Sequence, residues 1–248
     1  MVISCLLLDI EGTTTSISFV KDELFPYIRR KLESHLKNNW DSQEVQNDIE
    51  SLRKQATEDA TKMAGVPEIA SFCESPALIQ KSVISNVNWN MDQDRKMTAL
   101  KQLQGHIWRR GYSSGEIKGH LYEDVEEALK LWTSSGKQVY IYSSGSVEAQ
   151  KLLFEHSVAG NLLQYFSGHF DTKIGLKIES TSYQEISKSI EMEPDKILFL
   201  TDLPAEAIAA DKAGVQVKLL VRPGNAPLNE EILQRFSICR DFKEIQLT

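Results

Sequence analysis

Short apolar runs alternate with amphipathic helical patterns along the second half of the chain. The runs have the length of buried strands, whereas the segments between them repeat their apolar residues every three or four positions. Strands are predicted at 139–142, in a short segment ending at 171, at 197–200 and at 217–221, with helices near 125–134, 147–155, 181–190 and 205–213. Strand–helix alternation of this kind predicts an α/β fold with a doubly wound parallel sheet.

The first strand pattern stands apart from the others. Residues 2–8 form an apolar run typical of a buried strand, yet roughly the next hundred residues show helical patterns and no convincing strand. The clearest helix spans 21–40, where apolar side chains recur every four residues and Pro26 is tolerable only in the first turn. The economical interpretation is an α/β core of residues 1–20 and 115–248, with a helical cap, residues 21–114, inserted after the first strand.

Two carboxylates follow the first strand directly. Asp9 and Glu11 begin the segment Asp-Ile-Glu-Gly-Thr-Thr-Thr, at the carboxyl end of a strand where α/β proteins bind their ligands. A kink at Gly12 would aim both side chains at one crevice, as a nucleophile, an acid/base and a metal site require. The motif alone favours equally an Asx-type turn that ends the strand with solvated charges.

Two later strand ends also carry polar groups suited to phosphate. The strand 139–142 runs into Ser143-Ser144-Gly145-Ser146, where hydroxyl and amide donors precede a helix and form a potential anion site. Taken alone, this segment is more simply a helix N-cap at Ser144 or Ser146. Asp202 follows the strand 197–200 and has the same alternative.

An electrostatic argument connects these loops. A carboxylate nucleophile that approaches a phosphate dianion is repelled by roughly 4 kcal/mol per unit pair at about 4 Å and an effective dielectric constant near 20. Asp9 and Asp202 could together hold Mg²⁺, which binds readily to one or two carboxylates and several waters. A lysine from the loop 171–177 would neutralise the negative charge that Mg²⁺ leaves uncompensated. That loop offers both Lys173 and Lys177.

Composition limits the class of partner. The net charge is −7 and the isoelectric point about 5.4, so neither nucleic acid nor an anionic membrane is expected as a partner. The three cysteines are far apart without a Cys-x-x-Cys pair, as in reduced cytosolic proteins. We expect a soluble protein, located in the cytoplasm and also in the nucleus, that acts on a small molecule.

Several segments together resemble the haloacid dehalogenase-like phosphohydrolases, and within them the enolase-phosphatase family. Glu11, in place of the second Asp usual in the superfamily, is itself a mark of this family. The resemblance covers nearly the whole chain, and its segments are 9–28, 94–112, 139–154, 168–177, 197–202 and 221–228.

The resemblance implies a monomeric, Mg²⁺-dependent enzyme with one Mg²⁺ per subunit. Its substrate would be a phosphorylated diketone, 2,3-diketo-5-methylthiopentyl-1-phosphate. The enzyme would enolise this compound to a 2-hydroxy-3-keto enol phosphate and then remove phosphate. The product would be the acireductone 1,2-dihydroxy-3-keto-5-methylthiopentene of methionine salvage.

The resemblance also implies residue roles. Asp9 corresponds to the nucleophile and Glu11 to the acid/base. By position, the metal ligands would be Asp9, Glu11 and Asp202, and the substrate-binding residues Ser143, Ser144 and Lys177. No second Asp accompanies Asp202, so the outer metal shell would come from Glu206 or from water.

Two other functions use the same residues differently. A general sugar-phosphate phosphatase would share the core and differ in its cap contacts. A catalytically silent interaction protein is disfavoured because Asp9 and Asp202 are both present. In the cap, Trp108 either belongs to the cap's own core or receives the thioether of the substrate.

Overall fold

The computed structural model describes residues 2–247 and divides into two compact units. One unit runs up to Glu23 and resumes at Gly115, and the other is Leu24–Ser114. The sequence-based division had placed these boundaries after residues 20 and 114. No helix within residues 2–247 is long and apolar enough to cross a membrane.

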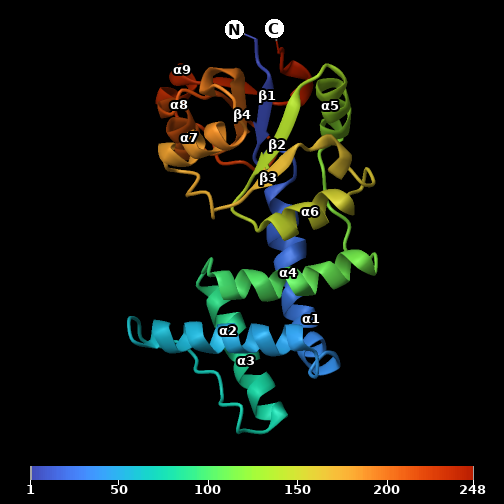
Figure 1. Ribbon diagram of the computed structural model, residues 1–248, viewed down its shortest axis with the longest axis vertical. Helices are drawn as coiled ribbons and strands as arrows, with labels where there is room; N and C mark the ends of the chain where they lie inside the picture. Colours follow the sequence, from blue (N-terminus) through green and yellow to red (C-terminus); the bar gives the residue numbers. More distant parts are fainter. Residues whose placement is uncertain (1, 248) are drawn as a thin grey trace. The chain divides into compact units, whose positions relative to one another are not determined.

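The first unit is built on a sheet of six parallel strands in the order β3-β2-β1-β4-β5-β6 (Figure 1). This arrangement confirms the predicted doubly wound α/β class, because the chain runs outward from β1 in both directions. The strands are β1 (Cys5–Leu8), β2 (Gln138–Tyr142), β3 (Gly168–Phe170), β4 (Ile197–Thr201), β5 (Gln216–Leu220) and β6 (Ser237–Cys239).

Helices cover both faces of this sheet, with α5 and α6 on one side and α7, α8 and α9 on the other (Figure 1). Their bounds are α5 (Glu123–Ser134), α6 (Val147–Glu155), α7 (Ser180–Ser189), α8 (Pro204–Lys212) and α9 (Glu230–Arg235). A sheet covered on both faces needs strands that are apolar on both sides. All four residues of β1 are accordingly at most 1% exposed.

The second unit contains four helices within the described residues. They are α1 (Phe25–Asn38), α2 (Gln43–Ala60), α3 (Pro76–Asp92) and α4 (Thr98–Ser113). A π-helical turn, Phe19–Leu24, precedes α1, so the predicted helix at 21–40 begins later than expected, with Pro26 in its first turn. Ser42 and Ser75 cap α2 and α3, because each hydroxyl accepts a hydrogen bond from a backbone N–H three residues on.

Candidate active site

The sheet register brings the polar strand ends together. Leu8 on β1 pairs with Ile141 on β2 and with Leu200 on β4. Asp9 follows Leu8 directly, and Asp202 lies two residues beyond Leu200. Because parallel strands end at the same edge of a sheet, the loops after β1, β2 and β4 share one crevice.

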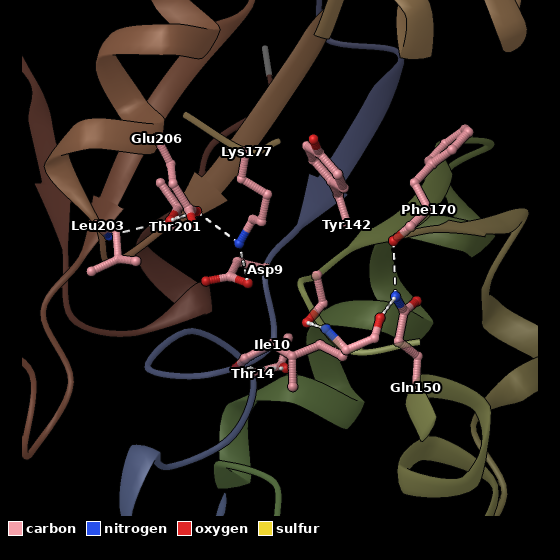
Figure 2. Close-up of polar contacts among 12 residues, drawn as sticks. Asp9, Ile10, Thr14, Tyr142, Gln150, Phe170, Lys177, Thr201, Leu203 and Glu206 are labelled. Carbon is pink, nitrogen blue, oxygen red and sulfur yellow. Dashed lines mark hydrogen bonds and ion pairs between the residues drawn. The ribbon is translucent and has the colours of Figure 1, made fainter. Parts of the chain in front are cut away.

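Lys177 lies between two buried carboxylates in this crevice (Figure 2). Its Nζ is 2.5 Å from Asp9 Oδ1 and 2.7 Å from Glu206 Oε2. Glu206 Oε2 also accepts a hydrogen bond from the Thr201 hydroxyl at 2.7 Å. Lys173 is exposed, so of the two lysines in the loop, Lys177 is the one beside Asp9.

Two tyrosines hold the loop 171–177, which carries Lys177, in place. The Tyr183 hydroxyl donates to Lys177 O at 2.7 Å, and the Tyr142 hydroxyl donates to Gly175 O at 3.0 Å. The lysine Nζ also lies 5.9 Å from the ring centroids of Tyr142 and Phe199, within cation–π range. Sequence reasoning missed both tyrosines; the available signal was a hydroxyl in an apolar pattern, which needs a partner when buried.

Negative charge exceeds positive charge in the strand-end cluster, which we define as Asp9, Lys177, Asp202 and Glu206. Burial, together with the charges of Asp9 and Glu206, raises the pKa of Asp202 to about 7. Burial and the charge of Asp9 likewise raise the pKa of Glu206 to about 7. Burial opposes the charge of Lys177, but its two carboxylate partners outweigh this effect and raise its pKa.

The donor set fits Mg²⁺. No group of three or more His, Cys, Asp or Glu side chains is arranged to hold a metal within residues 2–247. Mg²⁺ needs no such group, because one or two carboxylates suffice and water and substrate phosphate complete its octahedron. Asp9 and Asp202 supply the two carboxylates, and the charge imbalance around them favours a cation.

Gly12 allows Asp202 to lie against the first loop. Its φ is +70°, in the left-handed region, and a Cβ at this position would lie 2.4 Å from Asp202 Oδ2. Any other residue would therefore collide with the carboxylate as well as strain the backbone. The left-handed conformation of Gly12 forms the predicted kink, and the missing Cβ leaves room for the Asp202 carboxylate.

Glu11 is on the same loop, and its side chain is exposed. The loop closes through Gly12 N–H, which donates to Thr15 O at 2.8 Å, and through Thr14 N–H, which donates to Ile10 O at 2.9 Å. The structure thus gathers Asp9, Asp202 and Lys177 but does not place the Glu11 side chain in their buried cluster.

The serine loop, which we define as residues 143–146, lies at the end of β2. Ser143 is buried and Ser144 half-buried. The N-cap of α6 is Ser146, whose hydroxyl accepts from Ala149 N–H at 3.3 Å. Ser143 Oγ accepts from Gly145 N–H at 3.3 Å. The capping role that competed with substrate binding in the sequence thus falls to Ser146.

Gln150, which the sequence did not single out, braces this loop. Its side chain is 1% exposed, and its Nε2 donates to Gly145 O at 2.9 Å and Phe170 O at 2.8 Å (Figure 2). These two bonds connect the serine loop with the end of β3. The crevice therefore offers a buried carboxylate at Asp9, with a lysine, two further carboxylates and a hydroxyl-rich loop around it, and a carboxylate so placed could act as a nucleophile.

Comparison with known proteins agrees with this geometry. Residues 3–214 match the model of the haloacid dehalogenase-like hydrolases. "Enolase-phosphatase E1" of Anopheles gambiae is 52% identical over 97% of this chain and 81% of its own length. The Danio rerio protein of the same name is 50% identical over 97% of this chain and 94% of its own. The chain is a haloacid dehalogenase-like hydrolase of the enolase-phosphatase E1 family.

A solved structure agrees with this assignment. The UTR4 protein of Saccharomyces cerevisiae superposes with a TM-score of 0.76 at 32% identity, and the match covers 98% of this chain and all of the yeast chain. As a member of this family, the chain is a phosphatase. Haloacid dehalogenase-like hydrolases generally use Mg²⁺, which agrees with the carboxylate pair at the strand ends.

Proposed function

We propose that this phosphatase is the bifunctional enolase-phosphatase of methionine salvage. It would convert 2,3-diketo-5-methylthiopentyl-1-phosphate into the acireductone and phosphate. The observation that carries the proposal is the identity of about 50% to enolase-phosphatases over nearly the whole chain, cap included. The strand-end cluster supports the phosphatase half of the reaction.

Asp9 is the nucleophile in this proposal. One carboxylate oxygen attacks phosphorus and forms an aspartyl phosphate, while the bond between phosphorus and the leaving oxygen breaks. Lys177 neutralises the charge that Asp9 and the phosphoryl group bring together in the buried crevice. When bound by Asp9 and Asp202, one Mg²⁺ per subunit supplies further charge neutralisation and orients the phosphoryl group. The Glu11 contribution to that metal would come through its backbone carbonyl.

Glu11 moves the protons. Its carboxyl donates a proton to the leaving alkoxide and afterwards takes one from the water that hydrolyses the aspartyl phosphate. The water that hydrolyses the aspartyl phosphate enters from solvent, and the exposure of Glu11 supports this role. Ser143 and Ser144 would bind the substrate from the neighbouring strand end.

The proposal is tested with the diketone phosphate and a panel of sugar phosphates, assayed with Mg²⁺ and after treatment with EDTA. We expect rapid, Mg²⁺-dependent phosphate release from the diketone and little from the sugars. Equal rates on all esters would favour a general phosphatase. No release from any ester would favour the silent interaction protein.

Glu11→Gln separates the two half-reactions. The variant should lose phosphate release, since the amide cannot exchange protons. If Glu11 also serves the first step, the ultraviolet absorbance of the enol phosphate will not build up. A variant that accumulates the enol normally confines Glu11 to phosphoryl transfer and assigns enolisation to another residue.

The monomeric state and the cytoplasmic and nuclear locations are part of the same proposal. The widely spaced cysteines without a Cys-x-x-Cys pair support an intracellular location, and the monomeric state is carried over from the family resemblance. Sedimentation of the purified protein and imaging of a tagged chain in cells test the two points directly.

A further inference from the structure

The turn after β5 holds the loop 9–15, called the nucleophile loop here because it carries Asp9. Asn225 Nδ2 donates to Gly12 O at 2.9 Å and to Leu220 O at 3.1 Å. Both acceptors are carbonyls, so the nitrogen of the amide must face them. The orientation of the Asn225 side chain is therefore fixed, and its oxygen faces away from both carbonyls.

The oxygen of this amide has no hydrogen-bond partner. Asn225 Oδ1 is buried and unpaired among the described residues. A Cβ built on Gly12 would lie 2.9 Å from this oxygen and 2.4 Å from Asp202 Oδ2. The two oxygens therefore flank the same point beside the nucleophile loop. Buried polar atoms are nearly always paired, and an exception calls for a water, an ion or a ligand.

Arg222 fixes the neighbouring carbonyl. Its Nε donates to Thr13 O at 3.2 Å, and its NH2 group pairs with Asp124 at 2.7 Å. Two successive carbonyls of the nucleophile loop, those of Gly12 and Thr13, are thus held by one turn. Arg222 and Asn225 are themselves fixed by these bonds, and side chains fixed in this way are suited to orient the ligands of a metal.

We propose that Asn225 is a positioning residue for magnesium, whose Oδ1 accepts a hydrogen bond from a water on the ion held by Asp9 and Asp202. The inference rests on the proposed Mg²⁺ function of the crevice. A water on a cation is a strong donor, and it would satisfy the one amide atom that the protein leaves unpaired. Nδ2 and Oδ1 thus have separate tasks: Nδ2 fixes the loop and Oδ1 faces the metal water.

Two substitutions separate these tasks. Asn225→Leu keeps the size of the side chain and removes both polar atoms. Asn225→Asp removes the donor but keeps an acceptor oxygen. Asn229→Leu, four residues later, is the matched control, because Asn229 Oδ1 only caps α9 through Ile232 N–H at 2.9 Å. Asn225→Ala is a second, smaller variant in case the leucine prevents folding.

The dissociation constant of Mg²⁺ is measured by calorimetry on each metal-stripped protein, together with the shift of Tm on adding Mg²⁺. Removing an outer-shell partner of a metal typically costs 10- to 100-fold in affinity. We expect a weakening of this size for Asn225→Leu and Asn225→Ala, and none for Asn229→Leu. Asn225→Asp should lower the Tm of the metal-free protein yet bind Mg²⁺ at least as tightly as the wild type.

Two results would overturn the inference. Tight Mg²⁺ binding by Asn225→Leu or Asn225→Ala would show that Oδ1 does not contribute. Equal weakening in the aspartate and leucine variants would assign the whole effect to the Nδ2 bonds. If the wild type itself does not bind Mg²⁺, the proposed function of the crevice fails, and this result is distinct from the other two.

Discussion

Each unit of the molecule contains a cluster of buried and half-buried charges, and the two clusters differ in their balance of acid and base. The strand-end cluster has three carboxylates for one lysine. The cap cluster, in the second unit, pairs two acids of α2 with two bases of α4, and its members are Glu44, Asp48, His106 and Arg109.

The cap cluster is internally paired. His106 Nδ1 lies 2.7 Å from Asp48 Oδ2, and Arg109 donates to Glu44 at 2.7 Å. The hydrogen bond that His106 donates to Asp48 raises the pKa of His106 against the effect of burial. Two acids thus meet two bases once His106 is protonated. Such a cluster holds helices in register and offers no surplus charge to a ligand.

The comparison shows which buried charges serve stability and which serve function. Burying unpaired charge is costly, so an unbalanced cluster persists only where another requirement maintains it. In the proposed function, the requirement at the strand ends is the binding of a cation and a phosphorylated substrate. The two clusters should therefore respond oppositely when one carboxylate is removed.

The largest effect is expected for Asp9, the proposed nucleophile. Asp9→Asn should reduce phosphate release by at least ~10³-fold, because an amide is a poor nucleophile and a weak Mg²⁺ ligand. The fold should survive, since one carboxylate fewer relieves the imbalance. Phosphate release per folded molecule is the measurement, with Asp211→Asn, which breaks an exposed pair with Arg235, as the control. Activity above a tenth of wild type would remove Asp9 from the nucleophile role.

The next largest effect separates the two lysines of one loop. Lys177→Met should lower kcat by ~10²–10³-fold, because removing a preorganised charge partner of the transition state has effects of this size. Lys173→Met should leave kcat unchanged, since Lys173 is exposed. A damaging Lys173→Met with a harmless Lys177→Met would contradict the assignment made from the ion pairs.

Much of the first unit could be predicted because its strands are apolar on both faces. A continuous apolar run such as that of β4 can only be a buried strand or a short buried helix. β6 was missed because three residues are too few to show a period, and α9, only six residues long, has too few turns to show one. The candidate site residues after β1, β2 and β4 could be predicted because polar residues follow the apolar strand runs abruptly.

The contacts between side chains within the site could not be predicted from the sequence in the same way. Glu206 lies in the first turn of α8, where an acid is favoured by the helix dipole alone. Its contact with Lys177 joins a helix residue to a loop residue about thirty positions earlier, and no local sequence pattern encodes such a contact. In the cap, Trp108 donates its indole N–H to Leu24 O at 3.0 Å. This contact within the unit favours the structural interpretation of Trp108.

Removing one acid from each cluster should change stability in opposite directions. In metal-free protein at pH 8, Asp48→Asn should cost ~3 kcal/mol, because it breaks the buried pair of Asp48 and His106. Asp202→Asn should instead stabilise by up to ~4 kcal/mol, since its pKa of about 7 against 3.8 means that ionisation opposes folding. Urea denaturation measures both free energies of unfolding, and losses in both variants would refute the contrast.

The smallest effect is a difference in pH dependence. The raised pKa of Asp202 adds stability that is complete below about pH 3.8 and is lost as the pH rises through about 7; Mg²⁺ should reverse this loss. The raised pKa of His106 adds stability that is complete below about pH 6.5 and is lost only as the pH rises through the higher folded value. Above pH 7, therefore, the free energy of unfolding of wild-type protein saturated with Mg²⁺ should still fall as His106 loses its proton. His106→Gln should lose less stability than the wild type over the same range in urea denaturation, because only the carboxyls of the strand-end cluster remain to titrate. An unchanged slope in that variant would place the titrating group elsewhere.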